Sequence, residues 1–114
     1  MPKDINLSQQ WEKIVLQLSN QFADGERLDM ESIMYLIGIQ ELGKGFQEFS
    51  KDDKINLMHI AICKLLEPQG YYKFDRLDDE GWPHYTLLKE VPKFTAQEQT
   101  KMMQEAIVGY FQEK

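Results

Sequence analysis

The spacing of apolar residues changes twice along this chain, and that change most narrows the folds open to it. Apolar residues recur every three or four positions, as on one face of a helix, in three segments before residue 70 and in one after residue 95. Over residues 71–91 they alternate with polar residues, as in strands that bury one face. The pattern predicts three helices, a two-stranded antiparallel hairpin and a C-terminal helix, a mainly helical α+β fold.

Short polar side chains mark where the helices are expected to begin, because they accept hydrogen bonds from the unpaired N–H groups of a first turn. Four residues have this position: Asn6, Asp29, Ser50 and Thr95. Glycine or proline is expected to end the first three helices, at Gly25, Gly43 and Pro68. The fourth helix is expected to continue through Phe111.

The second expected helix is apolar on nearly every side between Ile33 and Ile39, which predicts that it is buried. Gly38 lowers helix propensity, and a close helix crossing at that point would explain its presence. The connector that follows has two aromatic residues, Phe46 and Phe49, expected to hold it on the core. In the third helix the expected buried stripe comprises Ile55, Met58, Ile62, Leu65 and Leu66, widened by Leu57 and Ala61.

A four-residue turn at residues 78–81, with Gly81 last, sets the expected register of the hairpin. It pairs Leu77 with Trp82, Asp75 with His84, Phe74 with Tyr85, and Tyr72 with Leu87. Tyr72, Phe74, Tyr85 and Leu87 then share one face, which is expected to lie on helices. Pro83 lacks an N–H group, so its strand is expected to be an edge strand there.

Composition bounds the class of protein. The 114 residues make one domain, 1–114, in which about two-thirds of the unfolded chain's surface is buried. The net charge of −6 disfavours nucleic acid and anionic membranes as partners.

Cys63 has no second cysteine to pair with, which favours a reducing compartment. Since residues 1–10 also lack the apolar run of a secretory signal, a cytoplasmic location is expected.

The expected order of three helices, a hairpin and a further helix is similar to that of winged-helix domains, which makes a DNA-binding transcriptional regulator the first alternative function. The third helix offers Asn56, His59 and Lys64 to a DNA groove. The hairpin tip, however, has one cation, Arg76, against four carboxylates: Asp75, Asp78, Asp79 and Glu80. Such a tip repels phosphate, so nucleic acid is an unlikely partner.

His59 and Cys63 lie one helical turn apart and so share a helix face. The pair could supply two metal ligands, or a base beside a thiol nucleophile. Zinc needs a further ligand, and a cysteine among apolar neighbours usually acts as a small hydrophobic residue, so neither metal, cofactor nor enzymatic activity is expected. A small-ligand pocket formed by His59, Cys63 and Tyr72 is the second alternative function.

Two surfaces are expected to bind a partner. The hairpin is rich in aromatic residues, and two of them, Tyr71 and Trp82, fall on the face opposite to the one expected to pack on helices. The fourth helix has four apolar residues suited to self-association: Met103, Ile107, Tyr110 and Phe111. The sequence thus predicts a small cytoplasmic, non-enzymatic protein-interaction or adaptor domain that forms a homodimer.

Overall fold

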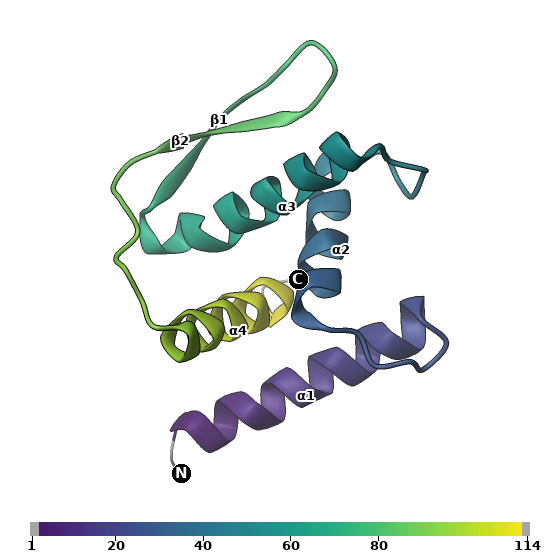
Figure 1. Ribbon diagram of the computed structural model, residues 1–114, viewed down its shortest axis with the longest axis vertical. Helices are drawn as coiled ribbons and strands as arrows, with labels where there is room; N and C mark the ends of the chain where they lie inside the picture. The colour runs from purple at the N-terminus through teal and green to yellow at the C-terminus, as the bar shows by residue number, and fades with distance from the viewer. Residues whose placement is uncertain (1–2, 113–114) are drawn as a thin grey trace. The chain divides into compact units, whose positions relative to one another are not determined.

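The computed structural model describes residues 3–112 and has the predicted order of elements (Figure 1). The helices are α1 (Lys3–Phe22), α2 (Met30–Leu42), α3 (Lys51–Leu66) and α4 (Ala96–Gln112). A short 3-10 helix, η1 (Glu67–Gln69), follows α3, and the strands are β1 (Tyr72–Leu77) and β2 (Pro83–Leu87). The fold is α+β and mainly helical, as predicted.

The chain divides into two compact units. One comprises Met1–Ile33 and Lys93–Lys114, and the other comprises Met34–Pro92. Compactness does not establish independent folding, so the expectation of a single domain over residues 1–114 remains a prediction.

In the first unit α1 packs against α4. The buried apolar side chains of these two helices are Trp11, Ile14, Val15, Leu18, Met103, Ile107, Val108 and Tyr110. Ser19 is buried among them, and its Oγ accepts a hydrogen bond from the N–H of Leu28 at 2.9 Å, which ties the loop after α1 back to the helix. On the surface, Arg27 binds both carboxylate oxygens of Glu12, at 2.9 and 2.6 Å.

The predicted start of the first helix at Asn6 is wrong, because α1 begins at Lys3 and Asn6 lies inside it. Residues 3–5 contain neither glycine nor proline, so each adds a backbone hydrogen bond to a helix that has already formed. That gain outweighs the single bond that an Asn6 cap would make.

The other three predicted helix starts are confirmed. Asp29 Oδ1 accepts from the N–H of Ser32 at 2.8 Å, and Ser50 Oγ accepts from that of Asp53 at 3.1 Å. Thr95 and Glu98 form a reciprocal box in which each side chain accepts from the other residue's N–H, at 3.1 and 2.9 Å. The stop at Gly43 is also confirmed, since this residue has a φ of 74°, which favours glycine.

In the second unit, α2 crosses α3 at Gly38, as the sequence predicted. A Cβ atom added to Gly38 would lie 2.3 Å from the carbonyl oxygen of Leu57, so only glycine allows this approach. A buried cluster lies beside this crossing: Ile39, Leu42 and Leu57, with Tyr35, Phe49 and Trp82 packed against them.

Two expected core residues are exposed instead. Ile55 is 59% exposed, because the crossing turns Leu57 inward and places Ile55 about 200° around the helix from it. The buried face of α3 consists of Leu57, Ile60, Ala61, Cys63, Leu65 and Leu66. Phe46 is 66% exposed, so Phe49 alone of the two connector aromatics reaches the core, where its ring meets that of Tyr35 edge-on.

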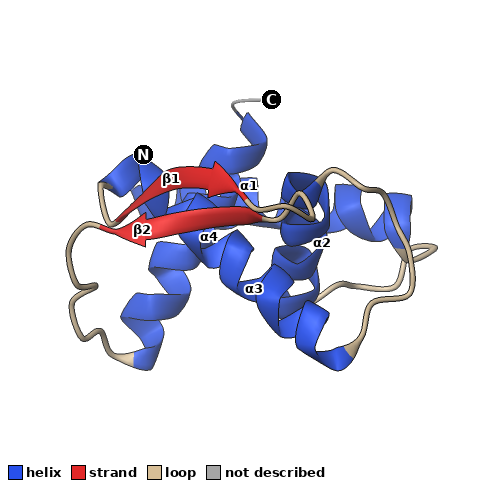
Figure 2. Ribbon diagram, turned by 90° about the horizontal axis from the view of Figure 1, so that it is seen from above, coloured by secondary structure: helices blue, strands red, loops and turns tan. Residues whose placement is uncertain are grey.

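The hairpin packs on α3, and Figure 2 shows its two strands lying antiparallel. The predicted pairs Tyr72 with Leu87 and Phe74 with Tyr85 are confirmed. The pairs predicted for Asp75 and Leu77 are wrong: the register shifts by one residue after Phe74, so Arg76 faces His84 and Leu77 faces Pro83. Asp75 is the extra residue of this bulge, and the bulge keeps Leu77 on the same apolar face as Phe74.

Within the described residues, no helix is both long and apolar enough to cross a lipid bilayer.

Replacement of Gly38 by alanine tests the helix crossing. We expect Gly38→Ala to lower the free energy of unfolding in urea by about 2–3 kcal/mol, because the new methyl group overlaps the backbone of Leu57. The matched control is Gly109→Ala in α4, where an added Cβ meets nothing within 4 Å. This control should raise the free energy of unfolding by about 0.5–1 kcal/mol. Equal effects of the two substitutions would contradict the crossing.

Candidate functional site

A groove of about 320 Å³ lies between α3 and the turn end of the hairpin. Its α3 wall consists of Asp53, Asn56, His59 and Ile60, and its hairpin wall consists of Asp78, Glu80, Trp82, Pro83, His84 and Tyr85. The second wall thus comes from the turn and β2, and none of the described residues of β1 contributes to it.

The groove follows the outer edge of β2. Successive side chains of a strand point to opposite faces, so His84 and Tyr85 lie on different faces of the hairpin. Both line the groove, as does Pro83 on the face of Tyr85. A surface that touches both faces of a strand runs along its edge, and the opposite wall is the polar side of α3.

The hydrogen-bond pattern of the hairpin shows which backbone groups this edge offers. The N–H of Leu88 donates to the carbonyl of Tyr71 at 2.8 Å, so these two residues form an inward-bonded pair. Because inward and outward pairs alternate in an antiparallel ladder, the N–H and C=O groups of Tyr85 and Leu87 point away from β1. The alternation thus leaves the N–H groups of Tyr85 and Leu87 on the outer edge of β2.

The outer edge of β1 is different, because the protein itself occupies it. The N–H of Phe74, which points outward by the same alternation, donates to Glu67 Oε2 at 3.1 Å. The bulge at Asp75 then interrupts the regular spacing of outward groups. The edge of β1 is therefore partly occupied by a side chain, whereas the edge of β2 faces the groove.

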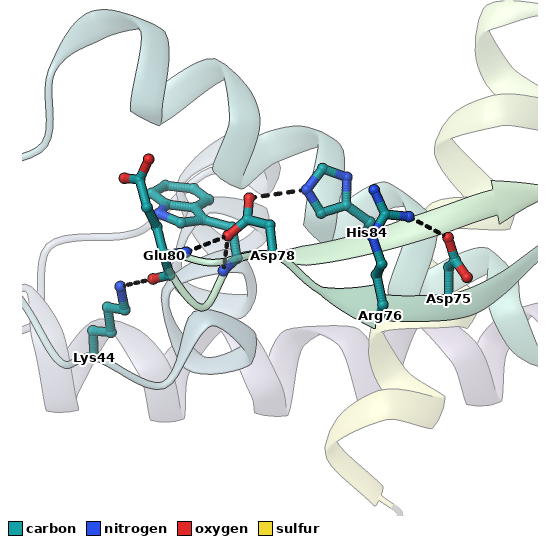
Figure 3. Close-up of polar contacts among 7 residues, drawn as sticks. Lys44, Asp75, Arg76, Asp78, Glu80 and His84 are labelled. Atoms are coloured by element: carbon teal, nitrogen blue, oxygen red, sulfur yellow. Dashed lines mark hydrogen bonds and ion pairs between the residues drawn. The ribbon is translucent and has the colours of Figure 1, made fainter.

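The turn beside the groove is organised by Asp78 (Figure 3). Its Oδ1 accepts from the N–H groups of Glu80 and Trp82, each at 2.9 Å, and its Oδ2 lies 2.9 Å from Nε2 of His84. The hydrogen bond to His84 and the two backbone donors hold the pKa of Asp78 below its ordinary value. Lys44 adds a further contact by donating to the carbonyl of Glu80.

The two hairpin aromatics predicted to bind a partner are both half-buried. Trp82 packs against the core of the second unit, where it holds the turn in place, and it also lines the groove. Tyr71 lies under the ammonium group of Lys89, with Nζ 4.7 Å from the ring centre. Of the two, Trp82 is the one that a ligand in the groove would meet.

The predicted ligand set of His59, Cys63 and Tyr72 comes together in the structure. Cys63 Sγ lies 3.5 Å from Nε2 of His59, and the ring of His59 meets that of Tyr72 edge-on at 6.3 Å. Only His59 reaches the groove, whereas Cys63 is fully buried. Burial raises the pKa of the Cys63 thiol to about 11, which opposes formation of a nucleophilic thiolate.

Three of the four side chains predicted to bind a partner on α4 are buried within the chain. Met103, Ile107 and Tyr110 are 7%, 0% and 8% exposed, and Phe111 is half-buried with its ring edge-on to Tyr110. A partner of α4 would therefore meet other side chains of the helix first.

Asn56 and His59 of α3 were expected to contact DNA. In the structure they line the α3 wall of the groove and face the hairpin. The third, Lys64, lies 3.5 Å from the carboxylate of Glu67. The two histidines have different partners: His84 binds Asp78, and His59 contacts Cys63.

Within the described residues, no three histidine, cysteine or acidic side chains are placed to hold a metal ion. Comparisons of the chain with protein-family models, with curated proteins and with solved structures found no match.

The protonation of Asp78 tests the geometry of the turn. Because its folded-state pKa is lowered, the stabilisation from its carboxylate is fully present above about pH 4, the ordinary value, and is lost as the pH falls through the folded pKa. We expect His84→Gln to raise the pKa of Asp78, measured by the NMR titration of its carboxyl carbon. The lowered pKa of Glu98 in the α4 cap serves as the control and should not move. An Asp78 that titrates at its ordinary value in the unmodified chain would contradict this account.

Proposed function

We propose that this chain is a non-enzymatic protein-interaction domain whose binding surface is its hairpin, and that it forms a homodimer through that surface. One observation carries the proposal: α3 covers only part of the apolar face of the hairpin.

The apolar face of the hairpin has six members: Tyr72, Phe74, Leu77, Pro83, Tyr85 and Leu87. Three of them, Tyr72, Pro83 and Tyr85, are half-buried. The other three remain exposed: Phe74 by 44%, Leu77 by 58% and Leu87 by 51%. A soluble domain that leaves three large apolar side chains on one small ribbon gains free energy when another surface covers them.

The opposite face of the hairpin is polar, so the two faces have distinct roles. Lys73, Arg76, His84 and Thr86 are all exposed there. A polar face can remain in water, so the apolar face is the one that a partner would cover.

The non-enzymatic part of the proposal is supported by the state of Cys63. Its thiol is the candidate nucleophile of the sequence, yet burial raises its pKa and separates it from the groove. The homodimer is supported by the same apolar strip, because a two-fold axis could place the strips of two copies against each other.

Light scattering coupled to size-exclusion chromatography tests the proposal. We expect the unmodified chain to have twice the 13.5 kDa mass of one copy, and the double variant Leu77→Ser, Leu87→Ser to have the mass of one copy at the same concentration. The loss of two leucines from each side of the interface should raise the dimer dissociation constant at least tenfold.

The matched control is Leu16→Ser, since Leu16 is as exposed as the hairpin leucines, at 56%, but lies on α1. This variant should remain dimeric. A monomeric unmodified chain, or an equal effect of the α1 substitution, would overturn the proposed dimer.

A further inference from the structure

The geometry points to the groove between β2 and α3 as a binding site for an extended, lysine- or arginine-containing peptide, which adds to β2 as a third, antiparallel strand. This inference rests on the proposed function, because it gives that function a ligand class and a docking mode. It concerns the open edge of the hairpin, whereas the proposed dimer uses the hairpin's apolar face.

The open edge of β2 supplies the backbone part of the recognition. Tyr85 and Leu87 each direct an N–H and a C=O group outward. These two residues are two positions apart, so alternate residues of an added antiparallel strand can bond to them. Pro83, at the turn end, has a carbonyl but no N–H group to offer. The five residues of β2 span about 16 Å, so the paired part of the peptide is about five residues long.

The edge of β1 is the less favourable one for an added strand. On β1, the N–H of Phe74 is already bonded to Glu67, and the bulge at Asp75 interrupts the ladder. Strand addition is therefore favoured on the β2 side of the hairpin, where α3 forms a second wall.

The charges lining the groove favour a cationic ligand. Three carboxylates line it, from Asp53, Asp78 and Glu80, and among its lining residues there is neither lysine nor arginine. Asp78 is already engaged with His84, so the carboxylates of Asp53 and Glu80 are the ones that meet the ligand. Burial and the nearby carboxylates of Glu41 and Glu67 raise the pKa of Tyr85 to about 12.

The direction of the added strand determines which peptide residues meet α3. In an antiparallel pair, the peptide residue that exchanges hydrogen bonds with Tyr85 has its side chain on the same face of the sheet as Tyr85. That face is turned toward α3, where Asp53, Asn56 and His59 line the groove. The basic side chains should therefore belong to the residues whose own N–H groups bond to β2.

A fluorescein-labelled six-residue peptide of alternating lysine and valine is the probe, and its binding is followed by fluorescence anisotropy. We expect saturable binding, with at least tenfold weaker binding of the peptide in which glutamate replaces lysine. Methylation of the lysine backbone nitrogens should abolish binding, because it removes the donors to β2. Methylation of the valine nitrogens should leave the affinity within threefold. Equal binding of both methylated peptides, or loss confined to the valine series, would overturn antiparallel strand addition.

The protein offers a matched pair of substitutions. Asp52 and Asp53 are neighbours in the first turn of α3, so the loss of either charge affects the helix alike, but only Asp53 lines the groove. We expect Asp53→Asn to weaken binding of the lysine–valine peptide about fivefold and Asp52→Asn to leave it nearly unchanged. Equal effects of the two substitutions would show that only the overall charge attracts the peptide, and would overturn the site.

Amide hydrogen exchange locates the bound peptide. The exchange of the Tyr85 and Leu87 N–H groups should slow when the peptide is added, and that of Phe74 should not change. If the first two N–H groups become protected as the concentration of the protein alone rises, the occupant is the β2 edge of a second copy, and the peptide proposal fails. The single variant Leu77→Ser, which changes β1 and leaves β2 intact, separates the two proposals. Peptide binding by this variant at a concentration where it is monomeric supports the groove, whereas a dimeric chain that binds no peptide overturns the groove alone.

Discussion

The close approach of α2 and α3 at Gly38 is the constraint on which the second unit depends. The carbonyl group of Leu57 lies so close to Gly38 that no side chain fits at that position. This contact determines which face of α3 is buried. With Leu57 turned inward, Trp82 packs on the core and holds the hairpin turn. Asp53, Asn56 and His59 are then left on the side of α3 that faces β2. The helix crossing at Gly38 and the groove thus involve opposite sides of the same helix, α3.

Local signals predicted the order of elements well, because each acts within a few residues. The caps at Asp29, Ser50 and Thr95 and the stop at Gly43 all depend on side-chain or backbone bonds spanning at most four residues. The buried face of α3 could not be predicted as reliably. Ile55 and Leu57 are both apolar, and the choice between them is made by the crossing at Gly38 of α2, which is 17 residues before Ile55 in the chain.

The candidate site was predicted only in part. Proximity of His59, Cys63 and Tyr72 followed from helical spacing and hairpin register, and Pro83 indicated an edge strand. The difference between the two edges depends on the bulge at Asp75 and on the bond between Phe74 and Glu67, which joins η1 to β1 and occupies part of the β1 edge. The same limit applies to Asp78: in the sequence it is one of four acidic residues at a turn, whereas in the structure it accepts three hydrogen bonds and organises that turn.

The bond from Phe74 to Glu67 has a consequence for assembly. A ribbon with two exposed edges can recruit strands on both sides, and such growth has no natural end. Here the carboxylate of Glu67 already accepts the outward N–H of Phe74, so a strand that joined β1 would first have to displace it. The hairpin is therefore biased toward pairing on the β2 side.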